Sequence, residues 1–511
     1  MTGPEHGAES RLGRWLAGPW PVVAAGLLVS LVVALVWGSF RPYPVMHDEW
    51  AYWAQAGQYA HFRWSVAAPP IPEFFEQFYL LITPVFAAKY PPGHAMSIAA
   101  GFALGLPALV PIVLNGVAGA LVFSLARREA GARVAALTLV LWLGAAGTLR
   151  FRASYFSEIT TTVCWLGAWW SLLRWRETRD WRWMVALALC IGWGAITRPF
   201  TMAVFALPVA AVVRRDVVRE RQWRALAIGV GAGTAVLLIL PLWSARTTGD
   251  VRTSPLALYT KQYLPFDVPG FSLSAALPER ALPPEMERTR HFLRDIKSTQ
   301  IETSVWRAAL LRTAAIFLDL FSGTRLPFVL TCLAGMIIVR GVARWALASS
   351  LLLVVAHLAQ AHTADWTVYY LEATPALAFA SAVGAAALWR RVQPQGVPCW
   401  TEVIIALALL IGVVQETFKA RSARARLAQR TTEFQQFVRT LPRSPNIVFV
   451  RYAMNRNMHL ALVANDGMLE SAPSWIVHDR GVDNQRLVAL APGRTAYLFD
   501  EAAGEFRELR P

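Results

Sequence analysis

The 511-residue chain is predicted to be an all-α polytopic membrane protein that carries a small α/β domain at its C-terminal end. Hydrophobic residues make up 55% of the chain and charged residues 16%, whereas a soluble domain carries about 25% charged residues. So many apolar side chains cannot all be buried in globular cores, and most of them must face lipid. Basic residues recur in short clusters between long apolar runs, as a membrane topology requires. An ordinary soluble enzyme is therefore excluded.

Charge and cysteine content narrow the class further. The net charge of +16 does not indicate a nucleic-acid partner, because the basic residues do not gather on one face or in one arm. The cysteines lie in or beside apolar runs, without close pairs or the spacing of a zinc site, so we interpret them as small apolar side chains. They are Cys164, Cys190, Cys332 and Cys399.

Apolar runs and arginine clusters predict the topology in order along the chain. The first run, 20–40, is long enough to span a membrane and is not followed by a small-residue cleavage pattern, so we expect a membrane span and not a signal peptide. About eleven spans are expected in all. They are 20–40, 106–126, 134–150, 157–174, 183–196, 200–213, 225–244, 326–340, 345–361, 367–389 and 400–417.

Five arginine clusters then fall on the same side of the membrane, at 127–133, 174–182, 214–224, 340–344 and 390–391. Because cytoplasmic loops carry an excess of Lys and Arg, this side is the cytoplasm and the protein is expected in the cytoplasmic membrane. Two loops, 41–93 and 245–325, and the tail 418–511 then lie outside. The amphipathic stretch 306–320 is expected to be an interfacial helix. The predicted domains are a transmembrane domain over 1–417 and a small soluble extracytoplasmic α/β domain over 418–511.

The tail combines a polar helix-like stretch, 421–440, with strand candidates at 447–450 and 497–499. Five basic residues at its start depart from the charge rule that orients the rest of the chain, since they lie just outside the last span. They are Lys419, Arg421, Arg424, Arg426 and Arg430.

The first outer loop contains two adjacent carboxylates, Asp48 and Glu49, beside His47, in the stretch 46–53 (MHDEWAYW). Acidic groups at the lipid–water boundary usually face a cavity or a partner, which favours a catalytic role. Alternatively, Asp48 is only the N-cap of an aromatic-rich interfacial helix and Glu49 lies in its first turn. Both roles are compatible with one another.

The same loop ends in 89–93 (KYPPG), just before the chain re-enters the membrane. Paired prolines fix an extended turn, and Gly93 permits a close backbone approach. Lys89 is a compact positive charge at headgroup depth, suited to a phosphate. The alternative is a snorkelling cation that anchors the next helix.

The order of first span, acid pair, aromatic loop, KYPPG turn and second span resembles the polyprenyl-phosphate-sugar glycosyltransferases of the GT-C fold. The protein O-mannosyltransferases and the lipid A aminoarabinose transferase are the members that it looks like. The stretches 197–199 (TRP), 247–259 (TTGDVRTSPLALY) and the pair Tyr369-Tyr370 add to the resemblance. It implies a GT-C-like transmembrane glycosyltransferase domain that moves a sugar from a polyprenyl-phosphate donor to an extracytoplasmic protein, lipid or glycan. Asp48 would be the catalytic base, Glu49 would complete the acid pair and Lys89 would bind the donor phosphate.

This chemistry suits the residue types, because a glycosyl phosphate already has a competent leaving group. The enzyme needs a base for the acceptor and fixed cations for the phosphate, and we expect inversion at the sugar. Further phosphate-binding candidates are Arg198, Arg246 and Lys261, although arginines at helix ends often serve only as anchors. Expected substrate-orienting residues are His47, Tyr90, Glu158, Tyr259 and Tyr370. For Glu158, an ion pair with Arg152 is an equal alternative.

No further cluster of ligands that would hold a zinc is visible, so the sequence gives no support to a metal cofactor. The runner-up function is a transporter or lipid-carrier flippase. It would need ionisable residues deep in the spans, whereas nearly all acids lie at the boundaries. A membrane scaffold that presents the tail is a third possibility, in which deletion of 418–511 would abolish function and loop substitutions would do little.

Overall fold

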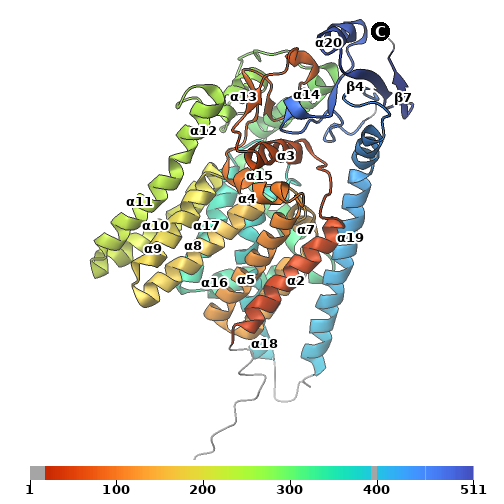
Figure 1. Ribbon diagram of the computed structural model, residues 1–511. Coiled ribbons are helices and arrows are strands. Elements are labelled where there is room, and N and C mark those ends of the chain that lie inside the picture. The colour runs from red at the N-terminus through yellow and green to blue at the C-terminus, as the bar shows by residue number, and fades with distance from the viewer. Residues whose placement is uncertain (1–17, 393–399, 455, 510–511) are drawn as a thin grey trace, which may run out of the picture.

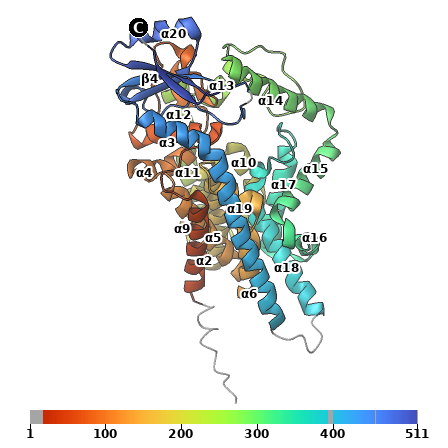
Figure 2. The same ribbon diagram turned by 90° about the vertical axis from the view of Figure 1, so that its right-hand side faces the viewer.

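The computed structural model describes residues 18–392, 400–454 and 456–509, and Cys399 lies outside them. A bundle of helices forms the body, and a small sheet domain covers one end of it (Figures 1 and 2). The helices of the body are α2 (Trp20–Trp37), α3 (His47–Ala60), α4 (Gly93–Ala103), α5 (Leu109–Ala130), α6 (Ala132–Leu143), α7 (Ala146–Arg152), α8 (Glu158–Thr178), α9 (Trp181–Ala195), α10 (Pro199–Glu220), α11 (Trp223–Leu237), α12 (Ile239–Thr248), α13 (Pro255–Tyr263), α14 (Pro284–Glu302), α15 (Val305–Leu320), α16 (Phe328–Ile338), α17 (Gly341–His357), the 3₁₀ helix η3 (Thr367–Ala373), α18 (Thr374–Val392) and α19 (Trp400–Arg439).

Within the described residues, four helical segments are long and apolar enough to cross a membrane: Trp20–Trp37, Leu109–Ala130, Trp223–Thr248 and Thr367–Arg391. Shorter apolar helices, among them α6, α9, α16 and α17, lie between them along the chain. Large apolar side chains on their outer faces are exposed, such as Leu31 on α2 and Leu207 on α10, as expected for surfaces in contact with lipid. The chain is a multi-pass membrane protein, and the predicted helical fold class is confirmed.

Helix α19 differs from the expected pattern, because the span 400–417 and the polar stretch 421–440 form one continuous helix of 40 residues. At about 1.5 Å per residue such a helix is about 60 Å long. It runs from the far end of the bundle up to the sheet domain (Figure 1). No proline interrupts it, and Arg, Ala and Gln are the commonest residues after residue 418, all of which favour helix. The domain boundary expected at 417/418 therefore lies inside α19.

The C-terminal sheet contains both predicted strands, and the α/β fold of the tail is confirmed. Its strands are β4 (Asn446–Arg451), β5 (Ser474–His478), β6 (Thr495–Asp500) and β7 (Glu505–Glu508), in the order β5-β4-β6-β7, with the short helix α20 (Asn484–Leu490). The central strand β4 pairs in parallel with β5 and β6, whereas β7 is antiparallel to β6. Its residues 446–450 are buried on both faces, which explains why this strand is a continuous apolar run.

The segment 41–93, which is expected to be an outer loop, folds between the bundle and the sheet domain. Helix α3 is followed by a small sheet of β1 (Val66–Ala67), β2 (Leu80–Leu81) and β3 (Val85–Ala88), in the order β1-β3-β2. Helix α3 differs from the expected interfacial helix, because most of its aromatic and apolar side chains are buried. Gly467 of the C-terminal domain touches its backbone, where an added Cβ would lie 2.1 Å from Ala54 O. The aromatic residues of α3 therefore build a protein core.

Gly93 makes the predicted close backbone approach, and its partner is the turn between α9 and α10. Its N–H donates to Ile196 O over 2.9 Å, and an added Cβ would lie 2.4 Å from Thr197 Oγ1 and 3.0 Å from the Ile196 carbonyl carbon. We expect Gly93→Ala to destabilise the protein by about 1–3 kcal/mol, because the turns would have to move apart. Thermal unfolding in detergent measures this loss. The matched control is Gly231→Ala on α11, where nothing lies within 4 Å, and an equal loss in both variants would contradict the prediction.

Candidate active site

The acid pair lies at the first turn of α3, beneath the C-terminal domain, and its two carboxylates have different roles. The N-cap residue is Met46, and Glu49 closes a capping box. Glu49 Oε2 accepts hydrogen bonds from the N–H groups of Val45 (2.8 Å) and Met46 (3.2 Å). The helix-capping role that the alternative interpretation gave to Asp48 is thus performed by Glu49.

Glu49 also joins α3 to the bundle through its other oxygen. Glu49 Oε1 accepts from Tyr155 N–H (3.1 Å) and from Arg424 Nη1 of α19 (3.3 Å). The residue is 1% exposed, so these donors replace water around the carboxylate. Both oxygens of Glu49 are engaged in holding the start of α3.

Asp48, by contrast, is half-buried and points to the KYPPG turn. Its Oδ1 accepts a hydrogen bond from the Tyr90 hydroxyl, and no partner is shown for Oδ2 among the described residues. Tyr90 is itself fixed by stacking on Tyr52 at 4.5 Å between ring centroids. The Tyr52 hydroxyl donates to Ser157 Oγ over 2.9 Å. Asp48 is therefore positioned by neighbouring aromatic residues with one carboxylate oxygen uncommitted.

Lys89 lies in the same site, directly after β3, among three tyrosine rings. Its Nζ is 4.0 Å from the ring centroid of Tyr79, 5.0 Å from that of Tyr259 and 5.2 Å from that of Tyr90. The residue is 7% exposed, and no carboxylate of the described chain lies within ion-pair distance of its ammonium. Aromatic faces stabilise a cation without occupying its N–H donors. The ammonium is thus held in place with its donors available to an anion.

Burial and charge act in opposite directions on these two groups. Burial raises the pKa of Asp48, and the Tyr90 hydrogen bond and the positive charge of Lys89 oppose this only in part. Burial lowers the pKa of Lys89, against the negative charges of Asp267 and Asp48. A carboxylate with a raised pKa accepts a proton more readily, and a cation in the same site can stabilise a neighbouring anion.

A buried group of charged side chains lies next to Tyr52, at the N-terminal ends of α8 and α10. Arg198 pairs with Glu158 and, at 3.4 Å, with Glu372. Glu158 does not pair with Arg152, which the sequence left open; Arg152 donates instead to Trp142 O and, over 2.7 Å, to Thr148 Oγ1. Glu158 interacts electrostatically with Asp48, so this group lies close to the acid pair.

Four further sequence candidates lie elsewhere. Arg246 is exposed on α12, and Lys261 is exposed and pairs with Glu279 at 2.7 Å. Tyr370 is buried, where its hydroxyl meets His362 Nε2 at 2.9 Å. His47 Nε2 lies 3.0 Å from Met458 O, and burial lowers its pKa to about 3, so its imidazole is neutral. The structure thus brings together Asp48, Lys89, Tyr90 and Tyr259, with Glu158 and Arg198 close by.

Sequence analysis assigned no site role to four residues that lie here: Tyr52, Tyr79, Asp267 and Tyr369. Tyr79 has a φ of 66°, a left-handed conformation that non-glycine residues rarely adopt and that functional sites often retain. Tyr369, and not its neighbour Tyr370, lies close enough for Asp48, Asp267 and Arg198 to affect its pKa. Only the Tyr369-Tyr370 pair gave a signal, since the sequence alone does not tell which of two adjacent rings faces the site.

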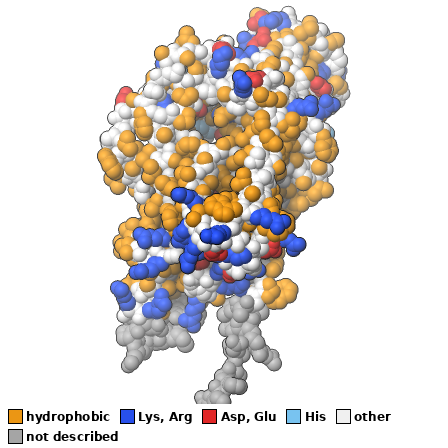
Figure 3. Space-filling model, turned by 90° about the vertical axis from the view of Figure 1, so that its left-hand side faces the viewer, with side chains coloured by type: hydrophobic (Ala, Val, Ile, Leu, Met, Phe, Trp, Pro, Cys, Tyr) orange, Lys and Arg blue, Asp and Glu red, His pale blue; other side chains and the backbone are white. Residues whose placement is uncertain are grey.

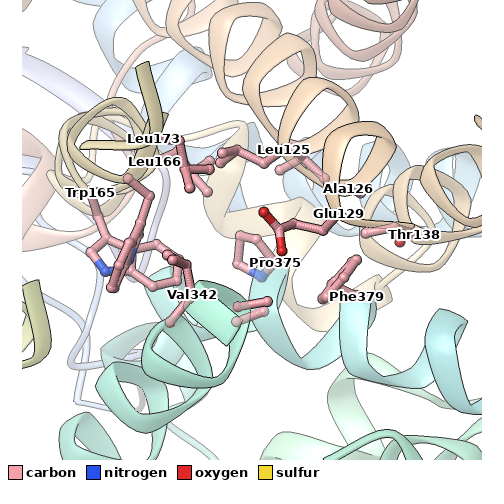
Figure 4. Close-up of a pocket in the computed structure, with 15 residues that line it drawn as sticks. Leu125, Ala126, Glu129, Thr138, Trp165, Leu166, Leu173, Val342, Pro375 and Phe379 are labelled. Atoms are coloured by element: carbon pink, nitrogen blue, oxygen red, sulfur yellow. The ribbon is translucent and has the colours of Figure 1, made fainter. Parts of the chain in front are cut away.

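Among the residues that the structure describes, no group of three or more His, Cys, Asp or Glu side chains could hold a metal ion. An apolar cavity of about 70 Å³ lies between α5, α6, α8, α17 and α18, with Glu129, Trp165 and Phe379 in its lining (Figure 4). None of the candidate site residues lines it, so this cavity is not part of the site around Asp48.

Comparisons with known proteins agree with this architecture. A family model described as dolichyl-phosphate-mannose-protein mannosyltransferase matches residues 89–244. The structure of ArnT from Cupriavidus metallidurans bound to undecaprenyl phosphate matches with a TM-score of 0.56 and 15% identity, over 93% of this chain and 92% of that one. The apo structure of the same protein gives 0.53 and 15%, over 94% and 93%. A search of curated proteins found no match.

The archaeal oligosaccharyltransferase AglB from Archaeoglobus fulgidus matches with a TM-score of 0.40 and 11% identity, over 96% of this chain and 74% of that one. This similarity is too low to carry an argument. The two ArnT matches cover nearly the whole of both chains and show that the fold is the same. The chain therefore has the GT-C fold that its sequence resembles.

Proposed function

We propose that this multi-pass membrane protein of the GT-C fold is a glycosyltransferase that takes a sugar from a polyprenyl-phosphate donor. The acceptor would be a protein, lipid or glycan outside the cytoplasm, and Asp48 would be the general base. The observation that carries the proposal is that Asp48 and Lys89 both meet Tyr90: Asp48 accepts from its hydroxyl, and the Lys89 ammonium lies 5.2 Å from its ring centroid. The ArnT fold, seen with undecaprenyl phosphate in that protein, and the mannosyltransferase family match support a lipid-linked donor.

In the proposed reaction, the acceptor hydroxyl or amine gives its proton to the free Oδ2 of Asp48 as its oxygen or nitrogen attacks the anomeric carbon. The bond from that carbon to the phosphate oxygen breaks, and its electron pair leaves with the polyprenyl phosphate. Lys89 stabilises the charge that develops on this phosphate. A single displacement inverts the configuration at the anomeric carbon, and Asp48 then releases its proton to solvent.

We assign the donor phosphate to Lys89 in preference to Arg198, because Arg198 already forms ion pairs with carboxylates. A phosphate at Arg198 would compete with the carboxylates of Glu158 and Glu372. At Lys89 it meets an ammonium surrounded by aromatic faces. Arg198 and Glu158 are then positioning residues beneath Tyr52, and Tyr259 and Tyr79 hold the lysine.

Replacing Lys89 with methionine should weaken donor binding by about 10- to 150-fold, because a charge-assisted hydrogen bond contributes about 1.5–3 kcal/mol. Methionine keeps the apolar stem among the tyrosine rings. Titration of purified protein with a polyprenyl phosphate measures the effect. Lys261→Met is the matched control, since this exposed lysine pairs with Glu279 outside the site. Equal affinities of Lys89→Met and wild type would contradict the assignment.

Mass spectrometry of cell-envelope glycans, glycolipids and glycoproteins, with and without this protein, tests the function itself. A glycosyltransferase predicts that one envelope component loses a sugar in its absence. Purified protein in liposomes should then release free polyprenyl phosphate from a labelled donor when that component is supplied. If the labelled lipid crossed the bilayer without loss of its sugar, the flippase alternative would be favoured and the proposal would fail.

A further inference from the structure

A cavity with a polar lining lies at the end of the bundle away from the C-terminal domain, between α5, α8 and α9. Its volume is about 360 Å³, far more than the roughly 10–15 Å³ that one water molecule needs. It is lined by Ser124, Arg127, Arg128, Trp170, Arg174 and Trp183. Three guanidinium groups and two indoles thus surround one space, formed by two helix C-termini and one helix N-terminus.

Arg128 and Arg174 are held in place by one shared carboxylate. Glu177 pairs with Arg128 at 2.7 Å and with Arg174 at 2.9 Å, so one carboxylate braces two guanidinium groups. Arg127 donates to Gly18 O over 2.7 Å. Arg128 and Arg174 together carry two positive charges against the single negative charge of Glu177. Since a guanidinium has five N–H donors, donors remain for a ligand, and the side chains of Arg128 and Arg174 are 31% and 41% exposed.

The two tryptophans of this cavity are typical of the boundary between water and lipid. The Arg174 guanidinium lies 5.6 Å from the Trp183 ring centroid, and Trp183 meets Trp170 edge to face at 4.9 Å. Indoles prefer the headgroup region, where one edge is polar and the other apolar. Figure 3 shows Lys and Arg side chains gathered in a band at this end of the molecule, beneath a mainly hydrophobic surface. The cavity therefore lies at headgroup depth.

We infer that this cavity binds the phosphate of an anionic phospholipid headgroup, with Arg128 and Arg174 as its principal ligands. Orientation by the positive-inside rule requires arginines in the loops at this end, but it does not require them to line a cavity with two tryptophans. Bidentate N–H donors suit phosphate, and basic pockets between spans at this face of a membrane favour anionic lipids. The site is distinct from Asp48 and does not depend on the proposed transferase activity.

Native mass spectrometry of the detergent-solubilised full chain, titrated with phosphatidylglycerol or phosphatidylcholine, tests the inference. Phosphatidylglycerol should bind in preference to phosphatidylcholine. The double variant Arg128→Gln/Arg174→Gln should bind it about 25-fold more weakly, since each basic residue near a membrane contributes about fivefold. Arg214→Gln/Arg219→Gln removes the same charge from exposed positions of α10 and should bind like wild type.

Equal weakening in both double variants would overturn the inference, because it would show attraction to net charge and not a site. Soluble glycerol phosphate separates the two sources of the anion: displacement of the lipid at equal affinity would show a free-anion site and would also overturn it. Glu177→Gln gives a second measurement that does not depend on removing an arginine. It frees two guanidinium groups from a competing carboxylate and should strengthen lipid binding, whereas weaker binding would contradict the proposal.

Discussion

Replacing Asp48 with asparagine is expected to lower the rate of sugar transfer by about 10²–10⁴-fold, which is the usual contribution of a general base. Asparagine has nearly the same shape and can still accept the Tyr90 hydrogen bond, but it cannot take the acceptor proton. Lys89 and its tyrosine rings remain unchanged, so binding of the donor lipid should stay near that of wild type. Release of polyprenyl phosphate from a labelled donor measures the rate, and titration with donor measures the affinity.

The matched control for Asp48→Asn is Asp365→Asn, an exposed aspartate just before η3. It should retain the wild-type rate. Retained turnover in Asp48→Asn would rule out Asp48 as the base. Loss of donor binding in parallel with turnover would make Asp48 a binding residue and would also contradict the mechanism.

The same carboxylate predicts the pH dependence of the reaction. Burial raises the pKa of Asp48, and only the ionised form accepts a proton, so activity is lost as pH falls through this raised value. The acid limb of kcat/KM should therefore lie above the ordinary aspartate value of about 3.9. The Tyr90 hydrogen bond lowers the Asp48 pKa, so Tyr90→Phe should move the limb to still higher pH. If the acid limb of Tyr90→Phe stayed at the wild-type pH, Tyr90 would have no influence on the pKa of the base.

Much of this architecture is predictable from the sequence because it depends on local patterns. Apolar runs of sufficient length predicted the helical membrane fold, and the short apolar runs 447–450 and 497–499 predicted the strands β4 and β6. The KYPPG turn and the acid pair frame one loop, so both would lie near one another in any compact fold. The candidate site could therefore be predicted from this one loop.

The remaining features depend on helix phase and on distant contacts. Adjacent residues of a helix point about 100° apart, so Asp48 and Glu49 cannot both face the KYPPG turn, and the register depends on where α3 begins. The choice between Tyr369 and Tyr370 is of the same kind. The partner of Glu49 is Arg424, 375 residues later, which no local pattern could reveal. Arg424 belongs to the basic cluster that departs from the charge rule after the last predicted span, and the structure shows it in a buried ion pair.

Replacing Arg424 with methionine is expected to destabilise the protein by about 3–5 kcal/mol, because it leaves the carboxylate of Glu49 buried without its cation. The side chains of Arg424 and Glu49 are 9% and 2% exposed, so water cannot replace the lost partner, and the guanidinium also lies 4.2 Å from the Trp37 ring centroid. Methionine keeps the apolar packing. Denaturation in mixed micelles measures the loss, and Arg421→Met, at an exposed position of the same helix, should leave stability nearly unchanged.

The double variant Glu49→Gln/Arg424→Met separates the ion pair from the packing around it. With the buried charge gone, it should be less destabilised than the sum of the two single variants. Because Glu49 fixes the first turn of α3, the loss of Arg424 should also lower transfer activity without changing the pH limb set by Asp48. If Arg424→Met were as stable as Arg421→Met, α19 would not hold the site in place through this contact.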